Sequence, residues 1–184
     1  MLTKHLFHIS GKKGSGKTTL LNWLSESGHF TTEVRFHLED AIAKEMFNPD
    51  KIPIPFWWTD QMINLCYEAI QEHNLVFLTG LYHPNELSFF KKEYEVHSIG
   101  IEVDDILRYE RILKRQREKE TSLTLEELKF KDQKREGIAQ GYKADINSLI
   151  KESEIILTNN GTIEDFKKEK EKLLTYLHKQ YFPK

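Results

Sequence analysis

Short apolar runs alternate with amphipathic stretches along the whole chain. The runs that predict strands are residues 5–10 (HLFHIS), 33–38, 75–79 (LVFLT), 96–103 and 154–158 (EIILT). Between these runs the pattern predicts helices after Thr18, over 39–47, over 57–73, from Asp104 to about residue 119, and from Thr162 onward. Strands that alternate with helices favour a parallel sheet covered on both faces. The pattern therefore predicts an α/β fold of three layers around a five-stranded parallel sheet.

The domain organisation follows from length and composition. A chain of 184 residues has the size of one domain, and no repeat, linker or change of composition divides it. We therefore expect a single domain over residues 1–184. The segment 118–142 has few apolar and many charged residues. It is the candidate for a lid that closes over a substrate.

The overall composition is that of an ordinary soluble protein, with 30% charged and 39% hydrophobic residues. A formal net charge of -2 gives no general attraction to nucleic acid or membranes. The one cysteine, Cys66, cannot form a disulfide within the chain and fits a reducing compartment. No run approaches the roughly 18 apolar residues of a membrane helix. We expect a cytoplasmic monomer or homodimer without a membrane or nucleic-acid partner.

One glycine-rich segment carries a specific chemistry. GKKGSGKT, residues 11–18, stands between a predicted strand and a predicted helix, the context that a phosphate-binding loop requires. Its glycines let backbone N–H groups approach phosphate oxygens, Lys17 reaches the outer phosphates, and the Thr18 hydroxyl can bind Mg2+. ATP and Mg2+ are the expected cofactors. The residues predicted to bind them are Gly11, Lys12, Lys13, Gly14, Ser15, Gly16, Lys17, Thr18 and Thr19, with Thr18 as the metal ligand.

Four of the six arginines lie within ten residues, at positions 108, 111, 115 and 117. On a helix the first three share one stripe, while Ile106, Tyr109 and Leu113 form an apolar face, so we expect the arginines to project together away from the core. Arginine binds phosphate oxygens with two parallel hydrogen bonds, which suits a clamp on a phosphoryl group during transfer. The alternative is a solvated helix face. The candidate catalytic residues are Lys17, Arg108, Arg111, Arg115 and Arg117.

The loop, the order of elements and the arginines together resemble the nucleoside and deoxynucleoside monophosphate kinases of the adenylate kinase type, with dephospho-coenzyme A kinases as cousins. The similar segments are LRYERILKRQR (107–117), KDQKREGI (131–138) and SEIILTNNGTIEDF (153–166). The resemblance implies a P-loop kinase with a helical lid and a small phosphorylated acceptor, a nucleotide in most of the family. It also implies that the turn around Asn160 lies beside the donor base.

The chain departs from this family after the third predicted strand. Such kinases carry an aspartate and an arginine there, whereas this chain has Thr79 and Tyr82. In the family the acid helps to hold Mg2+ and the arginine grips the acceptor phosphate. The difference leaves the acceptor open, and it raises the alternative of a nucleotide-binding regulatory module without phosphotransfer.

The acceptor pocket is expected outside the carboxyl ends of the second and third strands, where open α/β sheets bind ligands. Charged side chains and flat apolar ones occur in the flanking segments, which suits a phosphorylated, nucleoside-like molecule. The candidates are Arg35, His37, Glu39, Asp40, Trp57 and Tyr82. The sequence thus predicts a kinase that moves the γ-phosphoryl group of Mg-ATP to such an acceptor, with a dephospho-coenzyme A kinase-like activity as a further alternative.

Overall fold

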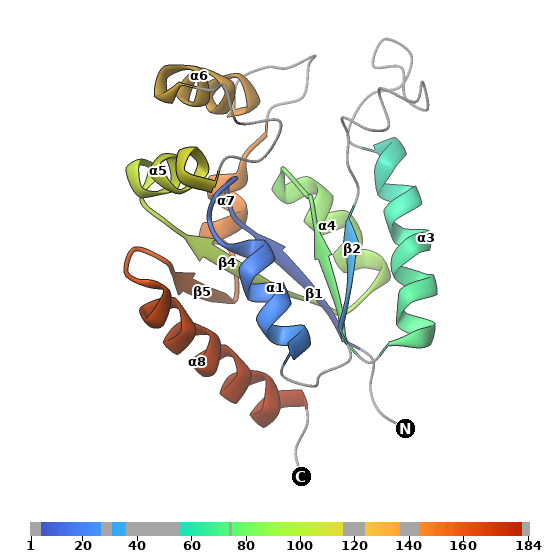
Figure 1. Ribbon diagram of the computed structural model, residues 1–184. Coiled ribbons are helices and arrows are strands. Elements are labelled where there is room, and N and C mark those ends of the chain that lie inside the picture. Colours follow the sequence, from blue (N-terminus) through green and yellow to red (C-terminus); the bar gives the residue numbers. More distant parts are fainter. Residues whose placement is uncertain are drawn as a thin grey trace.

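A parallel sheet forms the centre of the molecule (Figure 1). The computed structural model describes residues 5–26, 31–35, 56–73, 75–115, 124–136 and 144–181. The strands are β1 (His5–Ser10), β2 (Thr31–Arg35), β3 (Leu75–Thr79), β4 (Val96–Glu102) and β5 (Ile155–Thr158), in the order β2-β3-β1-β4-β5. The described helices are α1 (Lys17–Glu26), α3 (Phe56–Glu72), α4 (Pro84–Glu93), α5 (Asp105–Arg115), α6 (Leu125–Glu136), α7 (Ile146–Lys151) and α8 (Ile163–Tyr181). Among these, none has the length and apolar run needed to cross a membrane.

Helices cover both faces of the sheet, and the alternation of side chains along β1 explains why both faces are apolar. Phe7 and Ile9 point to one face, where they belong to a core with buried residues of α1 and α8. Leu6 points to the other face and packs with residues of α3, α4 and α7, among them Met62, Phe90 and Leu149. The predicted three-layer fold with a five-stranded parallel sheet is confirmed.

The strand order sets the position of the glycine-rich loop, residues 11–16. β1 pairs with β3 on one side and with β4 on the other. The chain leaves β1 where the order of strands reverses, and at such a point the carboxyl ends of the strands open a crevice for ligands. Figure 1 shows α5 and α6 stacked beyond this same edge of the sheet. Any ligand on the loop after β1 is therefore within reach of α5.

The predicted elements agree with the structure best where the apolar runs are continuous. β1 and β3 have the predicted bounds, and β4, β5, α1, α3, α5 and α8 differ from the predictions by a few residues where they are described. β2 begins two residues earlier than predicted. The predicted helix 39–47 lies outside the described residues. α6 occupies part of the predicted lid, whose remaining residues, 118–123 and 137–142, are also outside them.

Sequence analysis missed α4 and α7, although both begin with recognisable caps. His83 caps α4: its Nδ1 accepts a hydrogen bond from the Asn85 N–H at 3.1 Å, and the Glu86 carboxylate accepts from the His83 N–H at 2.9 Å. Pro84 occupies the first turn, where its missing N–H costs nothing. Asp145 caps α7 through the Ser148 N–H at 3.1 Å. The Pro-Asn-Glu and Asp-Ile-Asn-Ser segments were therefore the signals available in the sequence.

His8 is the least expected residue of the core. It lies in β1 with 0% exposure, and neither ring nitrogen has a hydrogen-bond partner among the described residues. Burial, together with the positive charges of Lys17 and Lys91, lowers the pKa of His8 from 6.5 to about 3. The imidazole is therefore neutral in the folded protein at any pH near neutrality. A buried polar group without a partner destabilises a fold by about 1–3 kcal/mol.

We predict that His8→Leu stabilises the protein and weakens the dependence of its stability on pH. The folded pKa lies below the unfolded value, so below pH 6.5 the unfolded chain binds the extra proton. The pKa shift of His8 therefore costs the folded state no stability above pH 6.5, and it lowers the stability as the pH falls from 6.5 toward 3, by up to about 1.4 kcal/mol per pH unit. Urea denaturation at pH 7, 6 and 5 measures this. His178→Leu, at an exposed position of α8, is the control; equal pH slopes for His8→Leu and wild type would contradict the buried neutral imidazole.

Candidate functional site: the phosphate loop and its supports

Residues 11–16 form a tight loop between the end of β1 and the start of α1. Gly14 has a φ of 85° and Gly16 a φ of 105°, a region of backbone conformation that residues with a side chain rarely adopt. A Cβ at Gly16 would lie 2.7 Å from Nδ2 of Asn159 and 2.9 Å from the Phe166 ring. The glycines therefore permit both the turn of the loop and its close contact with the segment after β5.

α1 begins at Lys17, so the positive end of its dipole faces the loop. The Lys17 ammonium lies across the loop and donates hydrogen bonds to the carbonyl oxygens of Gly11 and, at 3.1 Å, Lys12. Thr18, in the first turn, is exposed, and Thr19 is half-buried. This end of the helix therefore offers a cation, a hydroxyl and backbone N–H groups at the edge of the sheet, which is the chemistry that a polyphosphate and its Mg2+ need.

Asn159 fastens the loop from the opposite end of the chain. Its Nδ2 donates to the Ser15 carbonyl at 2.8 Å, and its backbone N–H donates to the Glu102 carbonyl at 2.9 Å. Asn159 is 7% exposed, so these hydrogen bonds are shielded from water. The Ser15 side chain is buried against Gly11.

Arg111 lies beside the turn that follows β5. Its Nη1 donates to the Asn159 carbonyl at 2.8 Å, and its Nη2 donates to the Gly161 carbonyl at 3.1 Å. Asn160, between them, accepts a hydrogen bond at Oδ1 from the Asp104 N–H at 2.7 Å. The turn 159–161 is thus tied to Arg111 of α5 and to Asp104, the residue before α5.

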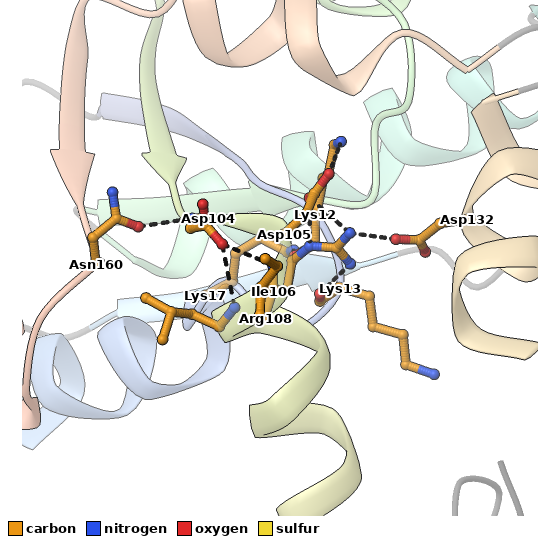
Figure 2. A network of polar contacts seen from close by, with 10 residues as sticks. Lys12, Lys13, Lys17, Asp104, Asp105, Ile106, Arg108, Asp132 and Asn160 are labelled. Atoms are coloured by element: carbon orange, nitrogen blue, oxygen red, sulfur yellow. Dashed lines mark hydrogen bonds and ion pairs between the residues drawn. The ribbon is translucent and has the colours of Figure 1, made fainter. Parts of the chain in front are cut away.

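Arg108 lies under the loop, with 0% exposure (Figure 2). Its Nη1 donates a hydrogen bond to the Lys13 carbonyl at 3.0 Å. Its Nε and Nη2 both donate to Oδ1 of Asp105, at 3.1 and 2.9 Å. Nη2 also donates to Asp132 of α6. Asp105 forms a further ion pair with Lys12 at 3.5 Å. Two lysines of the loop region, one arginine and two carboxylates therefore form one network.

The predicted orientation of the arginine stripe was wrong for Arg108. That prediction placed Ile106 on the apolar face and Arg108 away from the core, whereas Ile106 is 66% exposed and Arg108 is fully buried. The buried face of α5 consists of Arg108, Tyr109 and Ile112. Arg108 can occupy it because Asp105 and Asp132 neutralise its charge and accept its hydrogen bonds.

The network shifts the ionisation of its members. Burial alone would raise the pKa of Asp105, but the hydrogen bond and charge of Arg108, together with Lys12, outweigh it, so this pKa is lowered. Burial would lower the pKa of Arg108, but its hydrogen bonds to Asp105 and Asp132 reverse the direction and raise it. Asp105 and Arg108 are therefore charged at neutral pH.

The remaining predicted site residues are more widely spread. Arg115, at the end of α5, is exposed. The Tyr82 backbone is held between α4 and α7: its N–H donates to Glu86 at 2.6 Å and its carbonyl accepts from the Asp145 N–H at 2.7 Å. Arg35 ends β2 and Trp57 lies in the first turn of α3, and for these two residues the structure describes the backbone alone. The predictions for His37, Glu39, Asp40 and Arg117 fall outside the described residues.

A carboxylate that sequence analysis missed lies beside the end of β3. Thr79 is 2% exposed, and its hydroxyl donates a hydrogen bond to Oε1 of Glu33. Glu33 belongs to β2, in a register that places Arg35 opposite Thr79. Glu33 of the neighbouring strand therefore brings a carboxylate to the end of β3, where β3 itself has Thr79 and no acidic residue. A glutamate inside a short predicted strand was the available signal.

The comparisons with known proteins agree with this fold. No protein-family model matches the sequence. The chain is 32% identical over 172 residues to the UPF0200 protein of Sulfurisphaera tokodaii, covering 90% of this chain and 93% of that protein. The chain belongs to the UPF0200 family.

Solved structures of kinases share the fold of this UPF0200 chain. The shikimate kinase of Bacteroides thetaiotaomicron has a TM-score of 0.61 at 15% identity, covering 95% of this chain and 98% of its own. The gluconokinase of Sinorhizobium meliloti has a TM-score of 0.55 at 12% identity, with 97% of each chain covered. At these identities the likeness establishes the fold alone. The UPF0200 chain has the three-layer fold of P-loop kinases.

We predict that Gly16→Ala disrupts the loop. The left-handed φ and the two close contacts together should lower the free energy of unfolding by about 1–3 kcal/mol, as strained backbone positions do, and urea denaturation measures this loss. Gly161→Ala is the matched control, because a Cβ there would meet mainly the side chain of Asp165, which can move. Equal losses in the two variants would contradict the tight wrap of the loop around Gly16.

Proposed function

We propose that this UPF0200 chain is a phosphotransferase that moves the γ-phosphoryl group of Mg-ATP to a small phosphorylated acceptor of the nucleoside monophosphate kind. The observation that carries the proposal is the loop itself, wrapped on Gly14 and Gly16, with Lys17 at the start of a helix and two lysines beside it. This arrangement concentrates N–H groups and positive charge on one small volume, as a triphosphate requires.

The donor would be held by the loop and by Lys17. The N–H groups of the loop point their positive ends at phosphate oxygens, and Lys17 exchanges the carbonyls of Gly11 and Lys12 for the outer phosphates. The exchange is favourable because a phosphate oxygen carries more negative charge than a carbonyl. Lys12 and Lys13 add charge at the rim of the loop. Lys17 then stabilises the charge that develops as the phosphoryl group moves.

Mg2+ fits the chemistry of oxygen groups at this edge of the sheet. Thr18 presents an exposed hydroxyl, and Glu33 presents an exposed carboxylate held by Thr79. Among the described residues no cluster of three or more His, Cys, Asp or Glu side chains could hold a metal. Mg2+ accords with such a site, because it binds through few protein ligands together with substrate phosphates. When bound, the ion neutralises charge on the transferring phosphates. We assign Thr18 as its ligand and Glu33 as the acid that supports it.

The donor base would lie against the turn 159–161. Arg111 is bonded to two carbonyls of this turn, which fixes a flat guanidinium beside it, and a guanidinium plane stacks well on an aromatic base. Asn160 is exposed in the same turn. We propose that Arg115, exposed four residues farther along α5, and Arg117 act as a clamp on the phosphoryl group during its transfer.

The acceptor would bind at the carboxyl ends of β2 and β3. Tyr82 has a backbone fixed by α4 and α7, so its ring is carried on a rigid support. We propose Arg35, His37, Glu39, Asp40 and Trp57 as its companions, with α6 and its flanking segments, residues 118–142, as the lid of a single domain. A phosphate acceptor is already ionised, so positioning and charge suffice without a strong general base.

Two alternatives concern the acceptor. Thr79 and Tyr82, in place of an acid and an arginine, favour a module that binds nucleotide without transferring phosphate. The resemblance of residues 107–117 also fits a dephospho-coenzyme A kinase-like acceptor. The three functions differ in what must bind besides ATP, and therefore in what stabilises the fold.

A melting experiment separates them. The protein is heated with Mg-ATP, with each of a panel of nucleoside monophosphates and dephospho-coenzyme A, and with both together, while ADP is measured in parallel. A ligand that binds the folded state raises the midpoint by mass action. We expect shifts with ATP and with one acceptor, and ADP formation when both are present. If ATP alone raised the melting midpoint and no acceptor gave ADP, the kinase proposal would be refuted and the nucleotide-binding module without phosphotransfer would be the function that remains.

We predict that Lys17→Ala lowers the rate of phosphotransfer by about 100-fold or more, in the range found when a transition-state charge loses its partner. The free energy of unfolding should change by less than about 0.5 kcal/mol, because Lys17 supports no core. Steady-state kinetics and urea denaturation give the two quantities. Lys151→Ala, on the exposed end of α7, controls for loss of one positive charge. Wild-type turnover in Lys17→Ala would refute the donor site.

We predict that Glu33→Gln weakens the effect of Mg2+ on ATP binding by roughly tenfold, the lower end of what residues around a metal ligand contribute. Calorimetry with ATP in the presence of Mg2+ and of EDTA measures the ratio of the two dissociation constants. Binding of metal-free ATP should stay within about twofold, and Glu26→Gln, exposed at the end of α1, should leave both constants unchanged. An unaltered Mg2+ effect in Glu33→Gln would remove Glu33 from the site.

A further inference from the structure

Arg108 differs from Arg111 and Arg115 of α5, because it is the fully buried one of the three and is paired with two carboxylates. The guanidinium is fully buried, bonded to two carboxylates and to the Lys13 carbonyl, and its carbon lies 4.5 Å from the centre of the Tyr109 ring. A side chain held from so many directions cannot turn toward a phosphoryl group without breaking several charged hydrogen bonds. Its effect on a bound nucleotide must therefore pass through the loop.

The loop, α5 and α6 are packed in one stack. A Cβ at Gly14 would lie 2.9 Å from Cγ of Arg108 and 3.0 Å from Cγ1 of Ile112, so no space separates the loop from α5. Leu128 of α6 packs in a small buried cluster with Tyr109 and the same Ile112. Asp132 follows Leu128 by one helical turn and reaches Arg108, as Figure 2 shows.

We propose that Arg108 is a positioning residue that couples α6 to the phosphate loop: Asp132 of α6 holds the guanidinium where it supports the Lys13 carbonyl, so the docking of α6 sets the conformation of the loop and its affinity for nucleotide. The part of this inference that concerns nucleotide affinity rests on the proposed function. The part that concerns the loop conformation does not.

The charges explain why Asp132 matters. Asp105 lies on the same helix as Arg108 and is shared with Lys12, so it holds the guanidinium from the α5 side alone. Removing the Asp132 charge leaves a buried cation with one carboxylate where it had two. The guanidinium then gains by moving toward Asp105 and water, which removes the donor from the Lys13 carbonyl. The loop loses a support at the residue before Gly14.

The binding experiment uses wild type, Asp132→Asn, Arg108→Lys and the double variant. Glu126→Gln, which removes the same charge from an exposed position of α6, is the control. We expect each single change to weaken Mg-ATP by about tenfold, within the range usual for coupled sites. The double variant should be no weaker than Arg108→Lys, because Asp132 acts through Arg108. Unchanged affinity, or losses that add, would overturn the coupling.

Hydrogen exchange tests the same coupling without activity. In the nucleotide-free protein, residues 11–18 should exchange faster in Asp132→Asn than in Glu126→Gln. Since coupling is reciprocal, Mg-ATP should slow exchange of residues 125–136 in wild type and not in Arg108→Lys. Absence of ATP binding in wild type would refute the proposed function, and the nucleotide-free comparison would still decide the inference: equal exchange of the loop overturns it. Asp132→Ser, which also removes the charge, replaces Asp132→Asn if the latter does not fold.

Discussion

The phosphate loop does not hold its own shape, and the rest of the site depends on how that shape is imposed. Within residues 11–16 the described backbone makes one cross-turn hydrogen bond, from the Ser15 N–H to the Lys12 carbonyl at 3.1 Å. The Lys17 ammonium, directly after the loop, donates to the Gly11 and Lys12 carbonyls. Further restraints come from elements distant in the sequence: Asn159 after β5, Arg108 in α5 and the close approach of Phe166 in α8. Glycine makes the conformation possible. Lys17 and the three distant elements stabilise it.

The features that the sequence predicts well are those encoded by neighbouring residues. The loop, the strand before it and the helix after it form one continuous segment. The eight-residue motif 11–18 and the apolar run before it are therefore enough to predict their chemistry and order. The parallel sheet follows from repetition of the same strand-helix pattern. The two missed helices are short and begin at caps, and a cap is a weak signal beside an apolar period.

The features that the sequence could not give depend on partners far along the chain. Arg108 can face the loop because two carboxylates accept its hydrogen bonds, and one of them, Asp132, lies 24 residues away on another helix. The spacing of apolar residues alone predicts that Ile106 is buried and Arg108 exposed, whereas the structure shows the reverse. Thr79 likewise suggested a lost acid because one strand was considered by itself, whereas the sheet brings Glu33 from 46 residues away. Buried charge and pairing across a sheet are properties of the tertiary structure.

The hydrogen bond between Asn159 and Ser15 has a consequence for how the protein is made. It joins residues 144 positions apart. The strand before the loop also pairs with distant residues: His5 of β1 lies opposite Leu75 of β3, and Leu6 lies opposite Val96 of β4. A ribosome thus synthesises the glycine-rich segment long before its supports exist. Contacts of such sequence separation form late, because the intervening chain must first be ordered. The loop is therefore translated early and takes its described shape late, since a growing chain cannot form the hydrogen bond to Ser15 until Asn159 has emerged.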